Sequence, residues 1–100
     1  MTLAVTPLTA DEPAIEALVE LWEACGLLRP WNEPRADIRA ALAAPSSDIL
    51  VGRDGSNIIA SVMVGFDGHR GAVYYLAVAP DRARQRIGRQ MMKEAERWLE

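Results

Sequence analysis

The stretch "DILVGRDGSNIIASVMVGFDGHRGAVYYLAVAP" (residues 48–80) decides the fold of this chain. Asp54-Gly55 is a strong hairpin signal, and residues 67–71 form a second glycine-rich turn. These turns separate three runs that are apolar at most positions: residues 48–53, 57–66 and 72–78. We therefore predict three successive antiparallel strands, in a sheet that is covered on both faces.

Elements with strand or helix patterns flank this centre on both sides. Apolar residues alternate in the first of them and recur at helical spacing in the others. Thr9 or Asp11 is a suitable cap for the first helix, and Gly26 is a suitable stop. The flanking elements are a strand over 2–9, a helix from Pro13 to Gly26, a shorter helix over 34–44 and a helix over 84–99. The predicted order is β-α-α-β-β-β-α, an α+β fold with helices against a mostly antiparallel sheet, in one domain spanning residues 1–100.

The composition is that of a folded, mildly acidic protein: half of the 100 residues are hydrophobic and the net charge is −3. That charge argues against a protein that binds nucleic acid through bulk positive charge. Cys25 is the single cysteine, so we expect no intrachain disulfide. We recognise no signal peptide or membrane span, and therefore expect a cytoplasmic protein.

The bases gather in one place, the connection "PDRARQRIGR" (80–89), which carries four arginines and Gly88. The first turn of a helix presents backbone N–H groups and the positive end of the helix dipole, and arginines nearby strengthen such an anion site. A surface connector whose arginines pair with acids explains the same residues. The residues alone leave both interpretations open.

Three stretches resemble the GNAT superfamily of N-acetyltransferases. "YYLAVAPDRARQRIGRQMM" (74–92) is similar to its acyl-CoA-binding segment, where a strand ending in Val-x-Pro leads to an Arg/Gln-x-x-Gly-x-Gly/Ala loop and a long helix. "LWEACGLLRPWNEPRADI" (21–38) and "GFDGHRGAVYYLAV" (65–78) resemble the bacterial YpeA-like subgroup. The predicted order of elements also matches the first four strands and three helices of that fold.

The resemblance implies where acetyl-CoA, as co-substrate, would bind. Its pantetheine arm would pair with the end of the fourth strand at Leu76, Ala77 and Val78, where backbone amides would polarise the thioester carbonyl. Its pyrophosphate would lie on the loop and the helix start, at Arg84, Gln85, Arg86, Ile87, Gly88 and Arg89. The implied reaction is direct attack of a primary amine on the thioester.

The chain departs from the family pattern in two respects. Ala83 stands where the family has Arg or Gln, and Arg86 where it has its first glycine, whereas Gly88 matches. The family fold also continues beyond the third helix, with a fifth strand, a helix carrying the usual tyrosine acid, and a final strand pair. We therefore expect a C-terminally incomplete fold with an uncovered sheet edge, and from that edge a homo-oligomer.

The catalytic residue is not identified by the sequence; the candidates are Tyr75, Asp67 and Glu33. Tyr74 and Tyr75 should point to opposite faces of a strand, one into the core and the other toward the cleft. By resemblance, Trp31 and Asn32 would form a wall of the acceptor site; the alternative is a loop anchored by a buried tryptophan. His69 is expected in an exposed turn, and a lone histidine predicts no metal site.

These features together predict an acetyl-CoA-dependent N-acetyltransferase whose acceptor is an amine on a small molecule or peptide. The alternative is a non-catalytic acyl-CoA-binding or self-associating interaction module derived from the same fold. We expect no nucleic acid, membrane or metal partner. The sequence leaves the identity of the amine open.

Overall fold

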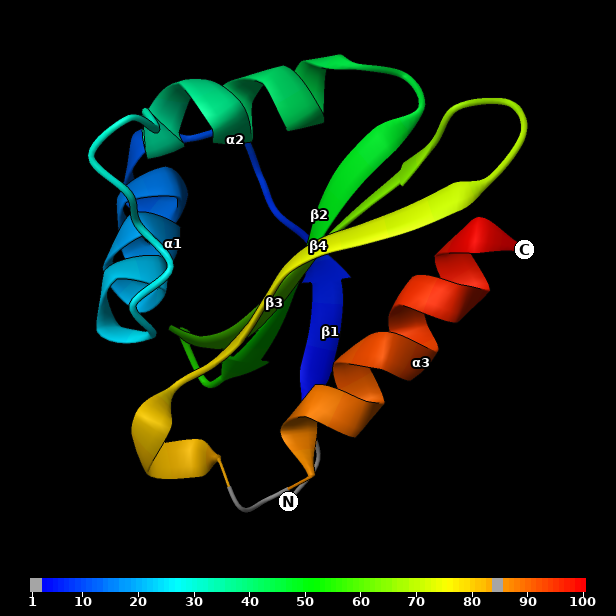
Figure 1. The fold of residues 1–100 in the computed structure, drawn as a ribbon. Helices are drawn as coiled ribbons and strands as arrows, with labels where there is room; N and C mark the ends of the chain where they lie inside the picture. Colours follow the sequence, from blue (N-terminus) through cyan, green and yellow to red (C-terminus); the bar gives the residue numbers. More distant parts are fainter. Residues whose placement is uncertain (1–2, 84–85) are drawn as a thin grey trace.

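The computed structural model describes residues 3–83 and 86–100 and has three layers, a sheet with helices on both faces (Figure 1). Helices α1 and α2 cover one face of the sheet, and α3 covers the other. The elements in chain order are β1 (Ala4–Pro7), α1 (Glu12–Ala24), α2 (Pro34–Ala43), β2 (Ser47–Asp54), β3 (Asn57–Phe66), β4 (Gly71–Val78), the 3-10 turn η1 (Pro80–Arg82) and α3 (Ile87–Leu99). The predicted α+β class and order of elements are confirmed.

The sheet is antiparallel throughout, with its strands in the order β1-β2-β3-β4. Asp54 pairs with Asn57 across a two-residue turn in which Gly55 has a φ of +64°. This is the left-handed region that glycine enters at little cost, which explains the strength of the hairpin signal.

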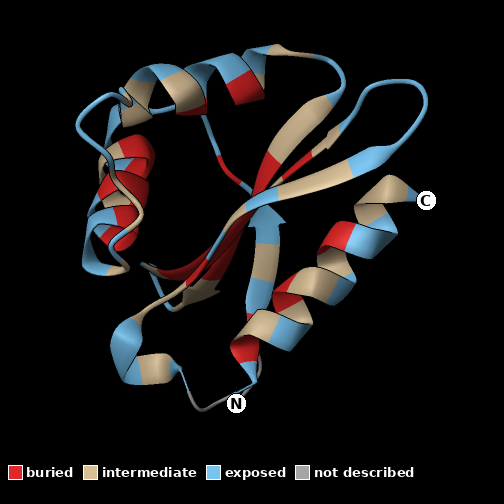
Figure 2. Ribbon diagram, viewed as in Figure 1, coloured by how far each residue is buried: buried red, intermediate tan, exposed pale blue. Residues whose placement is uncertain are grey.

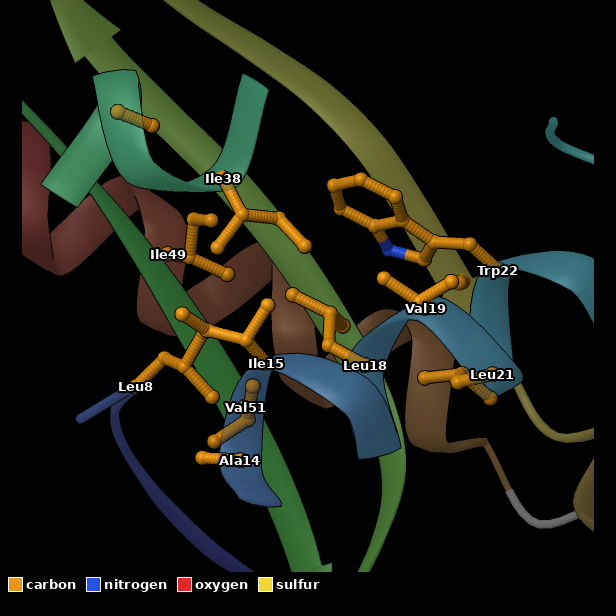
Figure 3. Close-up of a cluster of buried hydrophobic side chains, with 12 residues drawn as sticks. Leu8, Ala14, Ile15, Leu18, Val19, Leu21, Trp22, Ile38, Ile49 and Val51 are labelled. Atoms are coloured by element: carbon orange, nitrogen blue, oxygen red, sulfur yellow. The ribbon is translucent and has the colours of Figure 1, made fainter. Parts of the chain in front are cut away.

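Two clusters of buried side chains fill the spaces on either side of the sheet, and Figure 2 shows the buried residues concentrated on the central strands and the inward faces of the helices. Figure 3 shows the cluster under α1 and α2, where Trp22, Leu18 and Ile15 meet the sheet. The cluster under α3 contains Met91 and Ile87. The apolar runs of β2 and β3 are therefore explained by cover on both faces, as predicted.

Local signals set the beginning of the first two helices. The Asp11 carboxylate accepts a hydrogen bond from the Ala14 N–H at 3.0 Å, and the Glu33 carboxylate accepts one from the Arg35 N–H at 3.1 Å. Each helix also has a proline in its first turn, where no backbone N–H is needed. Asp11, rather than Thr9, caps α1.

Several predicted boundaries are wrong by a few residues. Strand β1 is shorter than the predicted 2–9, and helix α3 begins at Ile87 rather than at 84. Arg86 precedes α3 in a left-handed conformation, with a φ of +58°, so the helix does not extend back through it. The turn η1 was not predicted; Pro80 suits its first position. Within residues 3–83 and 86–100, no helix has the length and apolar character needed to cross a bilayer.

Candidate functional site

Strand β4 lies at the edge of the described sheet and carries a β-bulge. Ser61 of β3 pairs with Ala77, whereas Met63 pairs with Tyr74, so two residues of β4 lie opposite one residue of β3. The first of these two, Tyr75, has a φ of +50°, which is uncommon for a residue with a side chain. An edge strand whose pairing is interrupted in this way presents backbone groups that a ligand can reach.

A buried network holds the bulge in place. The Trp22 indole N–H donates to the Ser61 hydroxyl oxygen at 3.0 Å, and the Ser61 hydroxyl donates to the Tyr75 carbonyl at 3.2 Å. The Tyr75 ring also stacks on Trp22, with 4.0 Å between ring centroids and 9° between planes. Trp22, labelled in Figure 3, and Ser61 are both fully buried. The network therefore connects α1 through β3 to the irregular backbone of β4.

The start of α3 lies beside the end of β4. A Cβ built on Gly88 would lie 3.8 Å from a methyl group of Val78, which is ordinary contact. The Cys25 thiol donates to the Val78 carbonyl at 3.2 Å, so this half-buried cysteine has a structural contact on the same strand end. The structure therefore brings the strand end at residues 76–78 close to the helix start at residues 87–88, two groups that the family resemblance assigned to one site. Arg84 and Gln85, assigned to the same site, lie outside the described residues.

The arginines of this region differ in their surroundings. Arg82 forms an ion pair with Asp54 at 2.8 Å, so this cation has a structural role. Arg86 and Arg89 are exposed, and neither pairs with an acid among the described residues. Within the described part of the chain, Arg86 at the start of α3 makes no side-chain hydrogen bond that would cap the helix. The helix start and its two exposed arginines together form an electropositive surface beside the end of β4.

A groove of about 420 Å³ lies between α2, β3 and β4, on the face of the sheet that α1 and α2 cover and away from α3. Its lining is mostly apolar or aromatic: Asp37, Ala40, Ala41, Ser47, Met63, Val64, Gly65, Tyr74 and Tyr75. Burial raises the pKa of the Tyr75 phenol, and the negative charge and hydrogen bonding of Asp37 raise it further. The Tyr75 hydroxyl is therefore held in its neutral form beside the Asp37 carboxylate.

The two adjacent tyrosines differ in burial but both line the groove, so their orientation to opposite faces of the strand stays a prediction. Tyr75 packs against the cluster under α1 and α2, whereas Tyr74 is 55% exposed. Trp31 is 78% exposed, so the alternative of a loop anchored by a buried tryptophan is wrong. Neither Trp31 nor Asn32 is among the residues that line the groove. Their assignment to an acceptor wall stays a prediction.

The other two catalytic candidates have local structural roles. The Asp67 carboxylate accepts hydrogen bonds from the N–H groups of Arg70 and His69, at 2.8 and 2.9 Å, and these bonds lower its pKa. A depressed pKa makes a carboxylate a weaker base. Glu33 is exposed and caps α2. His69 is exposed in the turn, as expected. Among the described residues, no group of His, Cys, Asp or Glu side chains is arranged to hold a metal ion.

Two residues of this region, Ser61 and Asp37, were not among the candidates that the sequence indicated. Ser61 is the one polar residue in the buried set of the described chain, and it lies inside an apolar strand. A buried hydroxyl is expected to have a hydrogen-bond partner, which was the available signal. Asp37 has the sequence position of an ordinary first-turn acid of a helix, so nothing in the pattern marked it.

Comparison with known proteins defines the class. Residues 15–100 match the model of the Acetyltransferase (GNAT) family. An acetyltransferase of Pectobacterium atrosepticum is 44% identical over 84 residues, which cover 84% of this chain and 60% of that protein. One of Sodalis glossinidius is 42% identical over 84 residues, covering 84% of this chain and 59% of the relative. This chain belongs to the GNAT acetyltransferase family, and it spans about 60% of the length of these two relatives.

Solved structures share the fold. The PaiA N-acetyltransferase of Thermoplasma acidophilum in complex with coenzyme A has a TM-score of 0.78 at 15% identity, covering 99% of this chain and 72% of the other. An aminoglycoside acetyltransferase from a soil metagenomic sample, in complex with sisomicin, has a TM-score of 0.77 at 18% identity. The match covers 96% of this chain and 68% of the other. At these identities the likeness establishes the fold and nothing about the substrate.

Proposed function

We propose that this chain carries the acetyl-CoA-binding part of an N-acetyltransferase that acetylates a primary amine. The observation that carries the proposal is the bulged edge of β4 lying beside the start of α3. A relative in fold is described in complex with coenzyme A. The two stretches that resemble the YpeA-like subgroup, residues 21–38 and 65–78, favour that bacterial subgroup.

The residues beside this edge suit an acyl-CoA. Leu76, Ala77 and Val78 would pair with the pantetheine arm as an added strand, and their backbone N–H groups would polarise the thioester carbonyl. Gly88 adds no side chain to the surface at the helix start where the phosphates would lie; a Cβ at this position would only make ordinary contact with Val78. The exposed Arg86 and Arg89 would add positive charge for the phosphates.

Bound acetyl-CoA would supply an activated acyl group: the amine nitrogen forms a bond to the carbonyl carbon, the carbon–sulfur bond breaks, and the proton lost from nitrogen ends on the CoA sulfur. The chain's part is to align the thioester and to stabilise the developing negative charge on its oxygen. Tyr75 belongs to the bulge and is our candidate for a proton-transfer role because of this position; the raised pKa of its phenol makes it a weaker acid.

Calorimetric titration with acetyl-CoA and with free CoA tests the cofactor site, and thiol release on addition of an amine tests transfer. Gly88→Trp should abolish CoA binding while the far-UV spectrum stays unchanged, because the indole would fill the space in front of the end of β4. Lys93→Trp adds the same bulk at an exposed position further along α3 and should leave binding unchanged.

The outcomes separate the possible functions. Binding with thiol release supports the transferase, whereas binding without thiol release would favour a non-catalytic acyl-CoA-binding module. If CoA binding survives in Gly88→Trp, or if the unaltered chain binds neither ligand, the assignment of the site is wrong.

Homo-oligomerisation through the free edge of β4 and a cytoplasmic location stay predictions. Tyr74 and Leu76 leave part of that edge apolar and exposed, which supports self-association. A single monomeric species in sedimentation at high protein concentration would contradict it.

A further inference from the structure

Ser61 connects the buried interior to the irregular part of β4. It is fully buried and pairs with Ala77, the first residue after the bulge. Its hydroxyl accepts a hydrogen bond from the Trp22 indole and donates one to the Tyr75 carbonyl. An indole N–H can only donate, and a hydroxyl has one hydrogen to give, so the direction of these two hydrogen bonds is fixed. The Tyr75 carbonyl is therefore held toward the interior.

The orientation of this carbonyl decides where the next backbone N–H points. No peptide bond among the described residues is cis, so the peptide between Tyr75 and Leu76 is trans. In a trans peptide, the C=O group and the N–H group that follows it point in opposite directions. Because the Tyr75 carbonyl points toward Ser61, the Leu76 N–H points away from Ser61. Leu76 itself is exposed on the edge strand.

The backbone at Tyr75 depends on its surroundings for this conformation. A φ of +50° is costly for a residue with a Cβ, and such a conformation persists only where the neighbouring structure holds it. The hydrogen bond from Ser61 and the stacking of the Tyr75 ring on Trp22 are two contacts that do so. Both come from the packed interior, so the interior determines the shape of the edge.

We propose that Ser61 is a positioning residue for acyl transfer: by holding the Tyr75 carbonyl inward, it directs the Leu76 N–H at the carbonyl oxygen of the bound thioester. The inference rests on the proposed transferase function. Ser61 would contact neither acetyl-CoA nor the amine, and it would act through the peptide between Tyr75 and Leu76. A donor stabilises a developing oxyanion well only when it is already oriented, so loss of the hydroxyl should impair the reaction.

The test compares acetyl-CoA with free CoA, because free CoA has no thioester carbonyl. In calorimetric titrations well below the melting temperature, Ser61→Ala should weaken acetyl-CoA binding about fivefold and leave the affinity for free CoA unchanged. Infrared spectra of acetyl-CoA, isotope-labelled at the carbonyl carbon, give a direct signature. Binding should lower the stretching frequency of this carbonyl in the unaltered chain, and Ser61→Ala should abolish most of that shift.

Matched variants separate the hydroxyl from the packing. Ser61→Thr and Ser61→Val introduce side chains of the same shape, of which only threonine carries a hydroxyl. The frequency shift should persist in Ser61→Thr and be lost in Ser61→Val. Leu8→Ala weakens the same buried cluster at a site far from Trp22 in Figure 3, so it should lower the melting temperature and leave the frequency shift intact. If the added methyl group unfolds both Ser61 variants, Ser61→Ala and Leu8→Ala decide the test.

Equal losses of acetyl-CoA and CoA binding in Ser61→Ala, or a carbonyl frequency that does not depend on Ser61, would overturn the inference and leave the acyl-CoA site in place. If the unaltered chain binds neither ligand, the proposed function fails together with the inference. Thiol release is measured separately, and Ser61→Ala should lower kcat at least about tenfold with the KM for the amine unchanged. A Ser61-dependent carbonyl frequency without thiol release would contradict the transferase function alone.

Discussion

Replacing Ser61 with alanine tests whether the buried network supports the bulge of β4. The change removes the hydroxyl that accepts from the Trp22 indole N–H and donates to the Tyr75 carbonyl. It leaves the Trp22 ring in a fully buried position, so water cannot replace the lost acceptor without opening the core. We expect Ser61→Ala to destabilise the fold despite the greater hydrophobicity of alanine.

The magnitude follows from the groups that lose their partners. An unsatisfied buried donor costs about 1–3 kcal/mol, and the Tyr75 carbonyl, which has a second lone pair, costs less. We therefore expect a loss of about 2 kcal/mol in the free energy of unfolding. A domain of this size loses about 4–8 °C in melting temperature per kcal/mol, so the melting temperature should fall by about 8–16 °C.

Urea unfolding followed by far-UV circular dichroism measures the change, and a double-mutant cycle assigns it to the network. Trp22→Phe retains an aromatic ring beside Tyr75 but has no N–H, so Ser61→Ala should cost at least about 1 kcal/mol less in that background. Ser56→Ala, at an exposed position in the β2–β3 turn, is the control and should change stability by less than about 0.5 kcal/mol. Additive effects of the two core substitutions would refute the network.

Two further predictions concern the ends of helices. Arg86→Gly should stabilise the fold by about 0.5–1 kcal/mol, because glycine adopts the left-handed conformation of this residue without strain; a loss of stability in urea unfolding would contradict this. The Thr9 hydroxyl and the Ala14 N–H lower the pKa of Asp11 in the folded chain. The carboxylate therefore stabilises the fold above its unfolded pKa of about 4, and this stabilisation is lost as the pH falls through the folded pKa. Melting temperatures from pH 6 to 2 should fall less steeply in Asp11→Ala, and identical profiles would disprove the role of this cap.

Much of the fold was predictable because its signals are local. The hairpin at Asp54-Gly55 depends on one residue in the left-handed region, and the caps at Asp11 and Glu33 depend on contacts within a few residues. The first residue of α3 was predicted less accurately, because the helix start depends on the left-handed backbone conformation of Arg86, which the sequence does not show. This conformation also gives a reason for the glycine that the family pattern has at that position.

The family resemblance indicated that the end of β4 and the start of α3 lie together, and the structure places them side by side; that they bind acyl-CoA stays a prediction. The groove was not predictable, because its lining comes from α2 and three strands, and Asp37 has no distinctive sequence pattern. The burial of Trp31 was also not predictable from the sequence, because its position in a loop does not determine whether the ring is buried; in the structure the ring is largely exposed.

The sequence by itself determined the order of the elements and the cover of the central strands on both faces, because both depend on short-range periodicity. It also showed that the arginine-rich connection 80–89 lies in a segment resembling the acyl-CoA-binding segment of the family, because that motif is contiguous. Only the tertiary structure decided the conformation of β4. Its bulge is defined by the pairing with β3, and the hydrogen bonds that support it join residues 39 and 14 positions apart. Contacts at such separations form only when the helix and both strands have packed together, so no local pattern encodes them.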